Sequence, residues 1–173
     1  MILTLGHSVR PLDETLALLQ ENRVTLLADV RTFPRSRRNP QYDSAAFSSA
    51  LAQAGIAYRH MPELGGMRKP RPDSVNEGLK EEGFRGYADY MQSPEFARAL
   101  EQLLAFAASG RLAYLCAEAK PLECHRSLIS DALMARGIEI RHILGPGSTE
   151  PHAYTRYAEV HGDRVTYPFK LEG

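Results

Sequence analysis

The chain has 173 residues, of which 43% are hydrophobic and 24% are charged, as in an average globular protein, so a disordered chain is excluded. Its 21 lysines and arginines balance its 21 aspartates and glutamates, so no strong overall attraction to nucleic acid or to a membrane is expected. No apolar run approaches the ~20 residues that cross a bilayer, and there is no basic leader before an apolar segment. We therefore expect one domain over residues 1–173, in the cytoplasm and without a membrane partner.

The first third of the chain alternates between apolar runs and amphipathic stretches. Residues 2–8 (ILTLGHS) and 24–31 (VTLLADVR) predict buried strands. Between them, residues 11–22 begin with proline and carry leucines at helical spacing, which predicts a helix. A strand, a helix and a strand within ~30 residues favour a right-handed crossover between parallel strands. A helix at 44–55 and a strand at 56–64 are predicted next.

The rest of the chain continues this alternation after a Gly- and Pro-rich stretch at 64–78, which predicts a long exposed loop. A helical pattern over 86–109 breaks at Ser93 and Pro94, where serine is a good cap and proline a good first residue. The remaining predicted elements are a strand at 111–118, a helix at 125–137, a strand at 138–145 and a short edge strand at 165–169 in the tail.

This order of elements predicts a three-layer α/β fold, with a mostly parallel, Rossmann-like sheet and helices on both faces. In open α/β sheets, sites form beyond the carboxyl ends of the strands. Polar residues follow or end four of the predicted strands, namely Gly6-His7-Ser8, Asp29 and Arg31, Cys116 to Glu118, and His142. We therefore expect a shared polar pocket at one edge of the sheet.

The two cysteines lie in the stretch LCAEAKPLECHRS. A strand that ends in a cysteine, followed by a loop and by arginine and serine at a helix start, resembles the anion cradle of thiol phosphatases and sulfurtransferases. VTLLADVR is similar to a strand of rhodanese-like domains, but here the loop is longer, contains a proline and lacks the cradle glycine. Cys116 alone is expected to be a small buried residue. Cys124, beside a helix start and Arg126, is favoured as a thiolate.

Other residues at this edge allow two interpretations each. His7 is suited to acid–base catalysis or to anion binding, or else it caps the following helix or satisfies a backbone carbonyl. Asp29 and Arg31 share one face of a strand and form either a site or an ion pair. Arg35 and Arg37 suit bidentate binding of phosphate or carboxylate, or are solvated surface residues.

A metal site is a further alternative, because Cys116, Cys124, His125 and His7 could together supply four soft ligands. Their spacing matches no short zinc motif, in which paired cysteines lie ~2 to 4 residues apart. No metal and no cofactor is predicted.

Several motifs occur in a recognisable order: TLGHS, LLADVRTFPRSRRNPQYD, PELGG, GYADYMQSPEF and CAEAKPLECHRS. Together they resemble the bacterial and archaeal domain of unknown function 488 family, from about residue 3 to about residue 142. The tail at 146–173 lies outside the resemblance. The resemblance implies an α/β fold and strengthens the choice of site residues, but it implies no activity. The family pattern maps onto Gly6, His7, Ser8, Asp29, Arg31, Pro34, Ser36, Gly65, Gly66, Cys116, Glu118, Cys124, His125 and Arg126.

We therefore expect a hydrolase or transferase that acts on an anionic substrate, such as a phosphorylated small molecule, a nucleotide or a nucleic-acid end. The predicted catalytic residues are His7, Glu118, Cys124 and His125. The predicted substrate-binding residues are Ser8, Asp29, Arg31, Arg35, Arg37, Arg126 and Ser127. Two alternatives stay open: a non-catalytic module that binds a nucleotide, phosphate or nucleic acid, and a thiol enzyme of the rhodanese or phosphatase kind.

Overall fold

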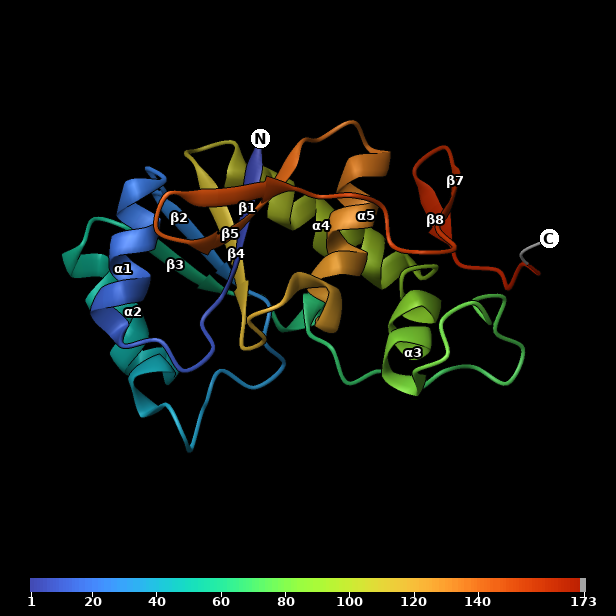
Figure 1. The fold of residues 1–173 in the computed structure, drawn as a ribbon, viewed down its shortest axis with the longest axis horizontal. Coiled ribbons are helices and arrows are strands. Elements are labelled where there is room, and N and C mark those ends of the chain that lie inside the picture. The colour runs from blue at the N-terminus through green and yellow to red at the C-terminus, as the bar shows by residue number, and fades with distance from the viewer. Residues whose placement is uncertain (172–173) are drawn as a thin grey trace.

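Six strands form a central sheet in the structure, which is a computed structural model that describes residues 1–171 (Figure 1). The strands are β1 (Ile2–Gly6), β2 (Leu26–Asp29), β3 (Ala57–His60), β4 (Leu112–Cys116), β5 (Ile140–Gly145) and β6 (Ser148–Pro151). Their order is β3-β2-β4-β1-β5-β6, and all neighbours are parallel except β5 and β6. The predicted α/β fold with a mostly parallel sheet is confirmed.

The three central strands are buried along their whole length. Their sequences ILTLG, LLAD and LAYLC are almost continuously apolar, as expected for parallel strands that are covered on both faces. Gly6 pairs with Cys116, and Asp29 pairs with Leu115. The three strands therefore end level with one another, and the residues that follow them emerge at the same edge.

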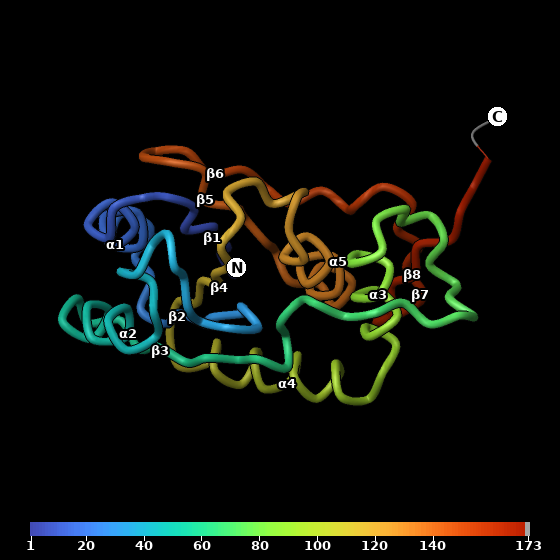
Figure 2. Tube along the Cα trace, turned by 90° about the horizontal axis from the view of Figure 1, so that it is seen from below, coloured from blue at the N-terminus to red at the C-terminus, as the bar shows by residue number. Residues whose placement is uncertain are grey.

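Helices cover both faces of the sheet. Helices α1 (Leu12–Glu21) and α2 (Ser44–Gln53) pack on one face, whereas α4 (Pro94–Ala107) and α5 (Arg126–Ala135) pack on the other (Figure 2). Helix α3 (Glu82–Tyr90) adds to the second layer through Tyr87 and Ala88. Each face has its own core, so the two helical layers anchor the loops at the sheet edge from both sides.

The break between α3 and α4 lies at Ser93 and Pro94, as predicted. The Ser93 hydroxyl accepts a hydrogen bond from the Phe96 backbone N–H, and Pro94 is the first residue of α4. Helix α3 begins at Glu82, earlier than the predicted residue 86. Strand β3 ends at His60 rather than at residue 64, because Pro62 begins a 3₁₀ turn.

The tail contributes more structure than its sequence pattern predicted. It supplies β6 at the edge of the main sheet, and a hairpin of β7 (Glu159–His161) and β8 (Arg164–Thr166). The predicted strand at 165–169 is therefore partly correct, but its partner is β7 rather than the main sheet. Val165 and Tyr167 are buried in the core beside α5. These strands are short and polar, so they lack the apolar run that identifies a strand in a sequence.

The predicted loop at 64–78 contains no long helix or strand, yet it is not wholly exposed. The Asn76 side chain is buried, donates to the Asp89 carboxylate over 2.7 Å and accepts from the Tyr167 N–H over 2.9 Å. The loop is thereby attached both to α3 and to the tail. No helix within residues 1–171 is sufficiently long and apolar to span a membrane.

Candidate functional site

A cavity of about 520 Å³ opens at the edge where β1, β2 and β4 end. Its wall is formed by the residue after β1, the loop after β2, the two residues 66 and 67 after β3, and both ends of the loop between β4 and α5. The lining residues are His7, Arg31, Thr32, Phe33, Arg35, Ser36, Gly66, Met67, Cys116, Ala117, Glu118, Cys124 and His125.

The cavity brings together much of the predicted site. The predicted residues in its wall are His7, Arg31, Arg35, Glu118, Cys124 and His125. Asp29 and Arg126 are buried behind the wall, and Ser127 is buried in α5, where its hydroxyl donates to the Cys124 carbonyl. Ser8 and Arg37 lie outside the lining. The predicted residues therefore divide into those that line the cavity, those that are buried behind its wall, and two that lie outside the lining.

Gly6 allows β1 to approach the loop after β4. A Cβ at this position would lie 1.7 Å from the Glu118 carbonyl oxygen. The backbone pairing continues beyond the strands, because the His7 N–H donates to the Cys116 carbonyl and the Ser8 N–H donates to the Ala117 carbonyl. Only glycine leaves room for this contact, which places His7 beside the thiols.

His7 is held in one tautomer. Its Nδ1 lies 2.8 Å from the Ser8 carbonyl oxygen and therefore carries the proton, so Nε2 accepts from Arg31 over 3.4 Å. Its ring stacks on Tyr42 with centroids 4.1 Å apart. Burial, together with the Arg31 charge, lowers the pKa of His7 to about 4, against the hydrogen bond to Ser8. His7 is thus a neutral imidazole near pH 7, and it lacks the extra proton of a general acid.

Arg31 and Asp29 form a buried ion pair. The Arg31 guanidinium donates to the Asp29 carboxylate through Nε over 2.9 Å and through Nη2 over 2.7 Å. Asp29 also accepts from the Tyr58 hydroxyl, and Arg31 also donates to the Tyr42 carbonyl. This pair corresponds to the structural interpretation of these two residues, although Arg31 also forms part of the cavity wall.

Arg126 is fully buried beneath the cavity floor. Its Nε donates to Cys116 Sγ over 3.0 Å, Nη1 donates to the Thr4 hydroxyl over 2.9 Å, and Nη2 donates to the Glu118 carbonyl over 2.7 Å. All three nitrogens of the guanidinium are therefore used within the protein. Arg126 is placed to act on the thiols rather than to contact a ligand in the cavity.

The two thiols differ in their electrostatics. Burial raises the pKa of Cys116 well above its usual value, and the hydrogen bond to Cys124 raises it further. Burial also raises the pKa of Cys124, but hydrogen bonds from Cys116 and His125 and the charges of His125 and Arg126 outweigh it and hold this pKa well below its usual value. Cys116 is therefore the protonated thiol, which also donates to the Glu118 carbonyl over 3.8 Å, and Cys124 is favoured as the thiolate.

The Cys124 sulfur lies among hydrogen-bond donors. The Arg126 backbone N–H, in the first turn of α5, donates to it over 3.4 Å, and His125 Nδ1 lies 3.6 Å away. His125 Nε2 donates to the Val30 carbonyl over 3.0 Å, so Nδ1 is the ring nitrogen that faces the Cys124 sulfur. Cys124 and His125 therefore form a thiol–imidazole pair in the cavity wall.

The mouth of the cavity is apolar as well as basic. Phe33 and Met67 line it although 66% and 79% of these residues are exposed. Met67 has a positive φ of 60°, which is uncommon outside glycine and holds its side chain at the mouth. Arg35 makes no hydrogen bond or ion pair with any residue from 1 to 171. A ligand with an anionic part and a planar or apolar part would match this mouth.

Some residues of this region were not identified from the sequence. Phe33 and Met67 lie in predicted loops, where exposed apolar side chains next to arginines and glycines were the available signal. Asp131 is buried in α5, and it was detectable as an acid on the apolar face of a helix.

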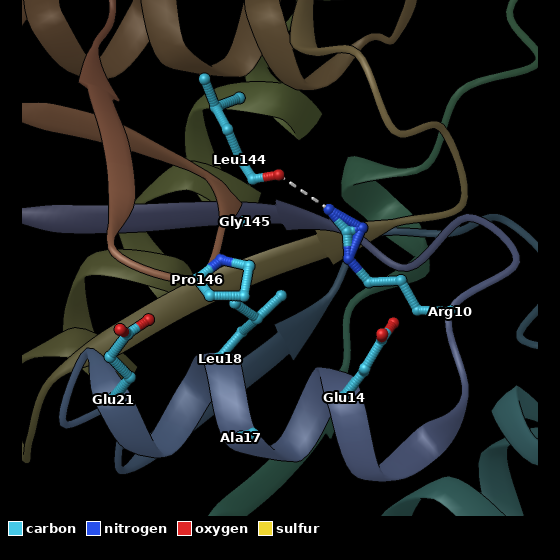
Figure 3. Close-up of a pocket in the computed structure, with 8 residues that line it drawn as sticks. All are labelled: Arg10, Glu14, Ala17, Leu18, Glu21, Leu144, Gly145 and Pro146. Atoms are coloured by element: carbon cyan, nitrogen blue, oxygen red, sulfur yellow. Dashed lines mark hydrogen bonds between the residues drawn. The ribbon is translucent and has the colours of Figure 1, made fainter.

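A second cavity, of about 440 Å³, lies between α1 and the β5–β6 hairpin (Figure 3). Its lining includes the apolar residues Ala17, Leu18 and Leu144 and the acidic residues Glu14 and Glu21. Arg10 lies at one end and donates to the Leu144 carbonyl over 3.0 Å. It contains no predicted site residue. We therefore place the candidate site at the first cavity.

Both cysteines are free thiols. Within the described part of the chain, no group of three His, Cys, Asp or Glu side chains is arranged to hold a metal ion. The polar groups that line the cavity include the thiols of Cys116 and Cys124, the imidazoles of His7 and His125, and the guanidinium groups of Arg31 and Arg35.

Comparison with curated proteins gives no match, and comparison with solved structures gives none either. The family described as "Domain of unknown function DUF488" matches residues 11–133. This range covers more than half of the chain and includes the loop after β2, both thiols and the start of α5. The chain therefore belongs to the family of the domain of unknown function DUF488.

Proposed function

We propose that this protein is an enzyme in which Cys124 attacks a small anionic substrate that binds in the cavity at the ends of β1, β2 and β4. The reaction class is transfer of a group to water or to a second acceptor. The favoured substrates are phosphorylated small molecules and nucleotides. Two free thiols, one of them a thiolate, also suit a protein that works in a reducing compartment such as the cytoplasm.

The observation that carries the proposal is the environment of the Cys124 sulfur. It receives a helix N-terminal N–H, it pairs with the His125 ring, and it lies in the wall of an open cavity. A buried cysteine with only a packing role needs none of these partners. A thiolate beside an imidazolium is the arrangement that activates a nucleophilic cysteine.

Positive charge at the cavity supports an anionic substrate. Arg35 is exposed and unpaired among residues 1–171, whereas the charge of Arg31 is already balanced by Asp29. The Arg35 side chain is therefore the group that is available to bind phosphate or carboxylate. Phe33 beside it provides an aromatic face for a planar group such as a base.

The proposed reaction has two steps. The Cys124 thiolate attacks the electrophilic atom, a bond from Sγ to that atom forms, and the bond to the leaving group breaks. The leaving group keeps the electron pair and takes the proton from His125 Nδ1. Water or the second acceptor then attacks the same atom, gives its proton to His125, and releases Cys124 as a thiolate.

A nucleotide-binding module without turnover is the second candidate. The observation in its favour is that Phe33 and Arg35 line the same mouth, because an aromatic ring and a guanidinium suit a base and a phosphate. A ligand that stays bound and unchanged on prolonged incubation would favour this candidate over the enzyme.

The test combines reactivity, protection and trapping. Iodoacetamide labelling of Cys124, followed by peptide mass spectrometry across pH, is expected to show a midpoint below about 8.5, the ordinary thiol value. Inorganic phosphate is expected to slow this labelling. Incubation with p-nitrophenyl phosphate or thiosulfate is expected to leave an adduct on the Cys124 peptide. An ordinary midpoint together with no adduct would overturn the proposal.

Matched arginine variants test the binding step. Arg35→Gln is expected to remove protection by phosphate while leaving the labelling midpoint in place. Arg37→Gln, two residues further along the same loop and outside the cavity wall, is expected to keep full protection. Equal loss in both variants would indicate a diffuse charge effect and contradict the role of Arg35.

A further inference from the structure

A line of buried hydrogen bonds connects the tail of the chain to the thiols. Asp131 Oδ1 lies 2.7 Å from His152 Nε2, His152 Nδ1 lies 2.8 Å from His142 Nε2, and His142 Nδ1 lies 2.6 Å from the Thr4 hydroxyl. Thr4 in turn accepts from Arg126, which donates to Cys116. Every residue in this line is buried.

The direction of each bond follows from the two ends. The Asp131 carboxylate only accepts, so His152 Nε2 carries a proton. With one proton on each ring, His152 Nδ1 accepts from His142 Nε2. His142 Nδ1 is then left without a proton and accepts from the Thr4 hydroxyl. The Thr4 oxygen in turn accepts from the Arg126 guanidinium, which only donates. All bonds therefore run in one direction, from the cation Arg126 to the anion Asp131.

The electrostatics of His142 fit this direction. Burial lowers the pKa of His142 to about 3, and the charge of Arg126 lowers it further. His142 therefore has a single ring proton near pH 7. Asp131 also accepts from the Tyr167 hydroxyl over 2.7 Å and from the Thr155 N–H over 3.0 Å, so its carboxylate is well satisfied.

We propose that Thr4, His142, His152 and Asp131 are positioning residues that hold the Arg126 guanidinium against the Cys116 sulfur and thereby keep Cys124 as the reactive thiolate. This inference rests on the proposed function, since it concerns the same thiol pair. Thr4, His142 and His152 lie outside residues 11–133, which the family matches. The tail that follows β5 thus contributes His152 to the positioning of Arg126, in addition to packing against the core.

Several other groups face Cys124, and they remain unchanged when Thr4 is substituted. His125 and Cys116 contact its sulfur, and Tyr87 and Tyr114 lie within electrostatic range. His7, Arg31, Arg35 and Glu118 share the cavity wall. A variant at Thr4 alters none of these side chains, so a change in Cys124 reactivity reports on Arg126.

Two variants of Thr4 separate positioning from packing. Thr4→Val keeps the shape and removes the hydroxyl, so Arg126 Nη1 and His142 Nδ1 lose their partner. Thr4→Ser keeps the hydroxyl and removes a methyl group. The midpoint of Cys124 labelling by iodoacetamide is expected to rise by about one pH unit in Thr4→Val, a tenfold loss of thiolate below the midpoint, and to stay in place in Thr4→Ser. A packing effect would give the reverse order.

Histidine NMR of the unaltered protein gives a second reading that needs no variant. Both His142 and His152 are expected in the Nε2–H tautomer. An Nδ1–H tautomer at His142, or an unchanged midpoint in folded Thr4→Val, would overturn the proposed positioning of Arg126 while leaving the proposed function intact. An ordinary labelling midpoint in the unaltered protein, together with no adduct on Cys124, would overturn the proposed function itself.

Discussion

Asp29→Asn is expected to destabilise the protein strongly. Asp29 is 0% exposed and Arg31 is 6% exposed. The carboxylate accepts two bonds from the Arg31 guanidinium, one from the Arg31 N–H and one from the Tyr58 hydroxyl. Asparagine keeps the shape but removes the charge, and its amide N–H₂ group would face donors. Arg31 would then be a buried cation without a counter-charge.

The size of the effect follows from burial. Removing one partner of a buried ion pair costs ~3–5 kcal/mol, and the Tyr42 carbonyl still accepts from Arg31. We therefore expect a loss near the lower end, about 3 kcal/mol in the free energy of unfolding. For a chain of this length, 1 kcal/mol corresponds to ~2–4 °C, so Tm should fall by ~6–12 °C.

Urea unfolding followed by circular dichroism measures this loss. Asp73→Asn is the matched control, because Asp73 pairs with Arg71 on the surface, where both are more than two-thirds exposed, and should cost at most ~1 kcal/mol. Adding Arg31→Met to Asp29→Asn should recover much of the stability, since no buried charge remains. A cost for Asp29→Asn as small as that of Asp73→Asn would refute the reasoning.

Three further predictions concern the site and its surroundings. Gly6→Ala should lower the free energy of unfolding by about 3 kcal/mol or more, because its Cβ would overlap a backbone carbonyl, whereas Gly83→Ala in α3, with open space around it, should be neutral or stabilising in the same urea assay. Cys116→Ala should raise the pH midpoint of Cys124 labelling, because the thiolate loses a donor, and Cys116→Ser should raise it less; equal midpoints would show that Cys116 is not the donor. The pKa of His142, lowered to about 3 by burial, predicts that unfolding free energy falls as pH drops below about 6.5, by up to ~1.4 kcal/mol per pH unit, since only the unfolded chain takes up the proton. His142→Gln should reduce this slope between pH 7 and pH 5, and an unchanged slope would contradict the assignment.

Local pattern was sufficient for much of the fold. Apolar runs of strand length separated by amphipathic helices leave few arrangements other than a parallel sheet with helices on both faces. The same rule placed His7, Arg31 and the two thiols at one edge, because parallel strands bring their carboxyl ends together. The tail was harder to interpret, because β6, β7 and β8 are short and polar and acquire partners only in the folded chain.

Hydrophobic periodicity and strand direction are encoded locally, so the amino-acid pattern was enough to predict the layers of this protein and the sheet edge where its polar side chains gather. The role of each residue at that edge depends on the folded arrangement. Arg126 and Arg35 are both arginines in polar segments, yet one is buried with its nitrogens bound to Thr4, Cys116 and a carbonyl, while the other stays unpaired among residues 1–171 at the cavity mouth. Burial and hydrogen-bond partners depend on which distant segments pack together, and Thr4 meets His142 across 138 positions of the chain.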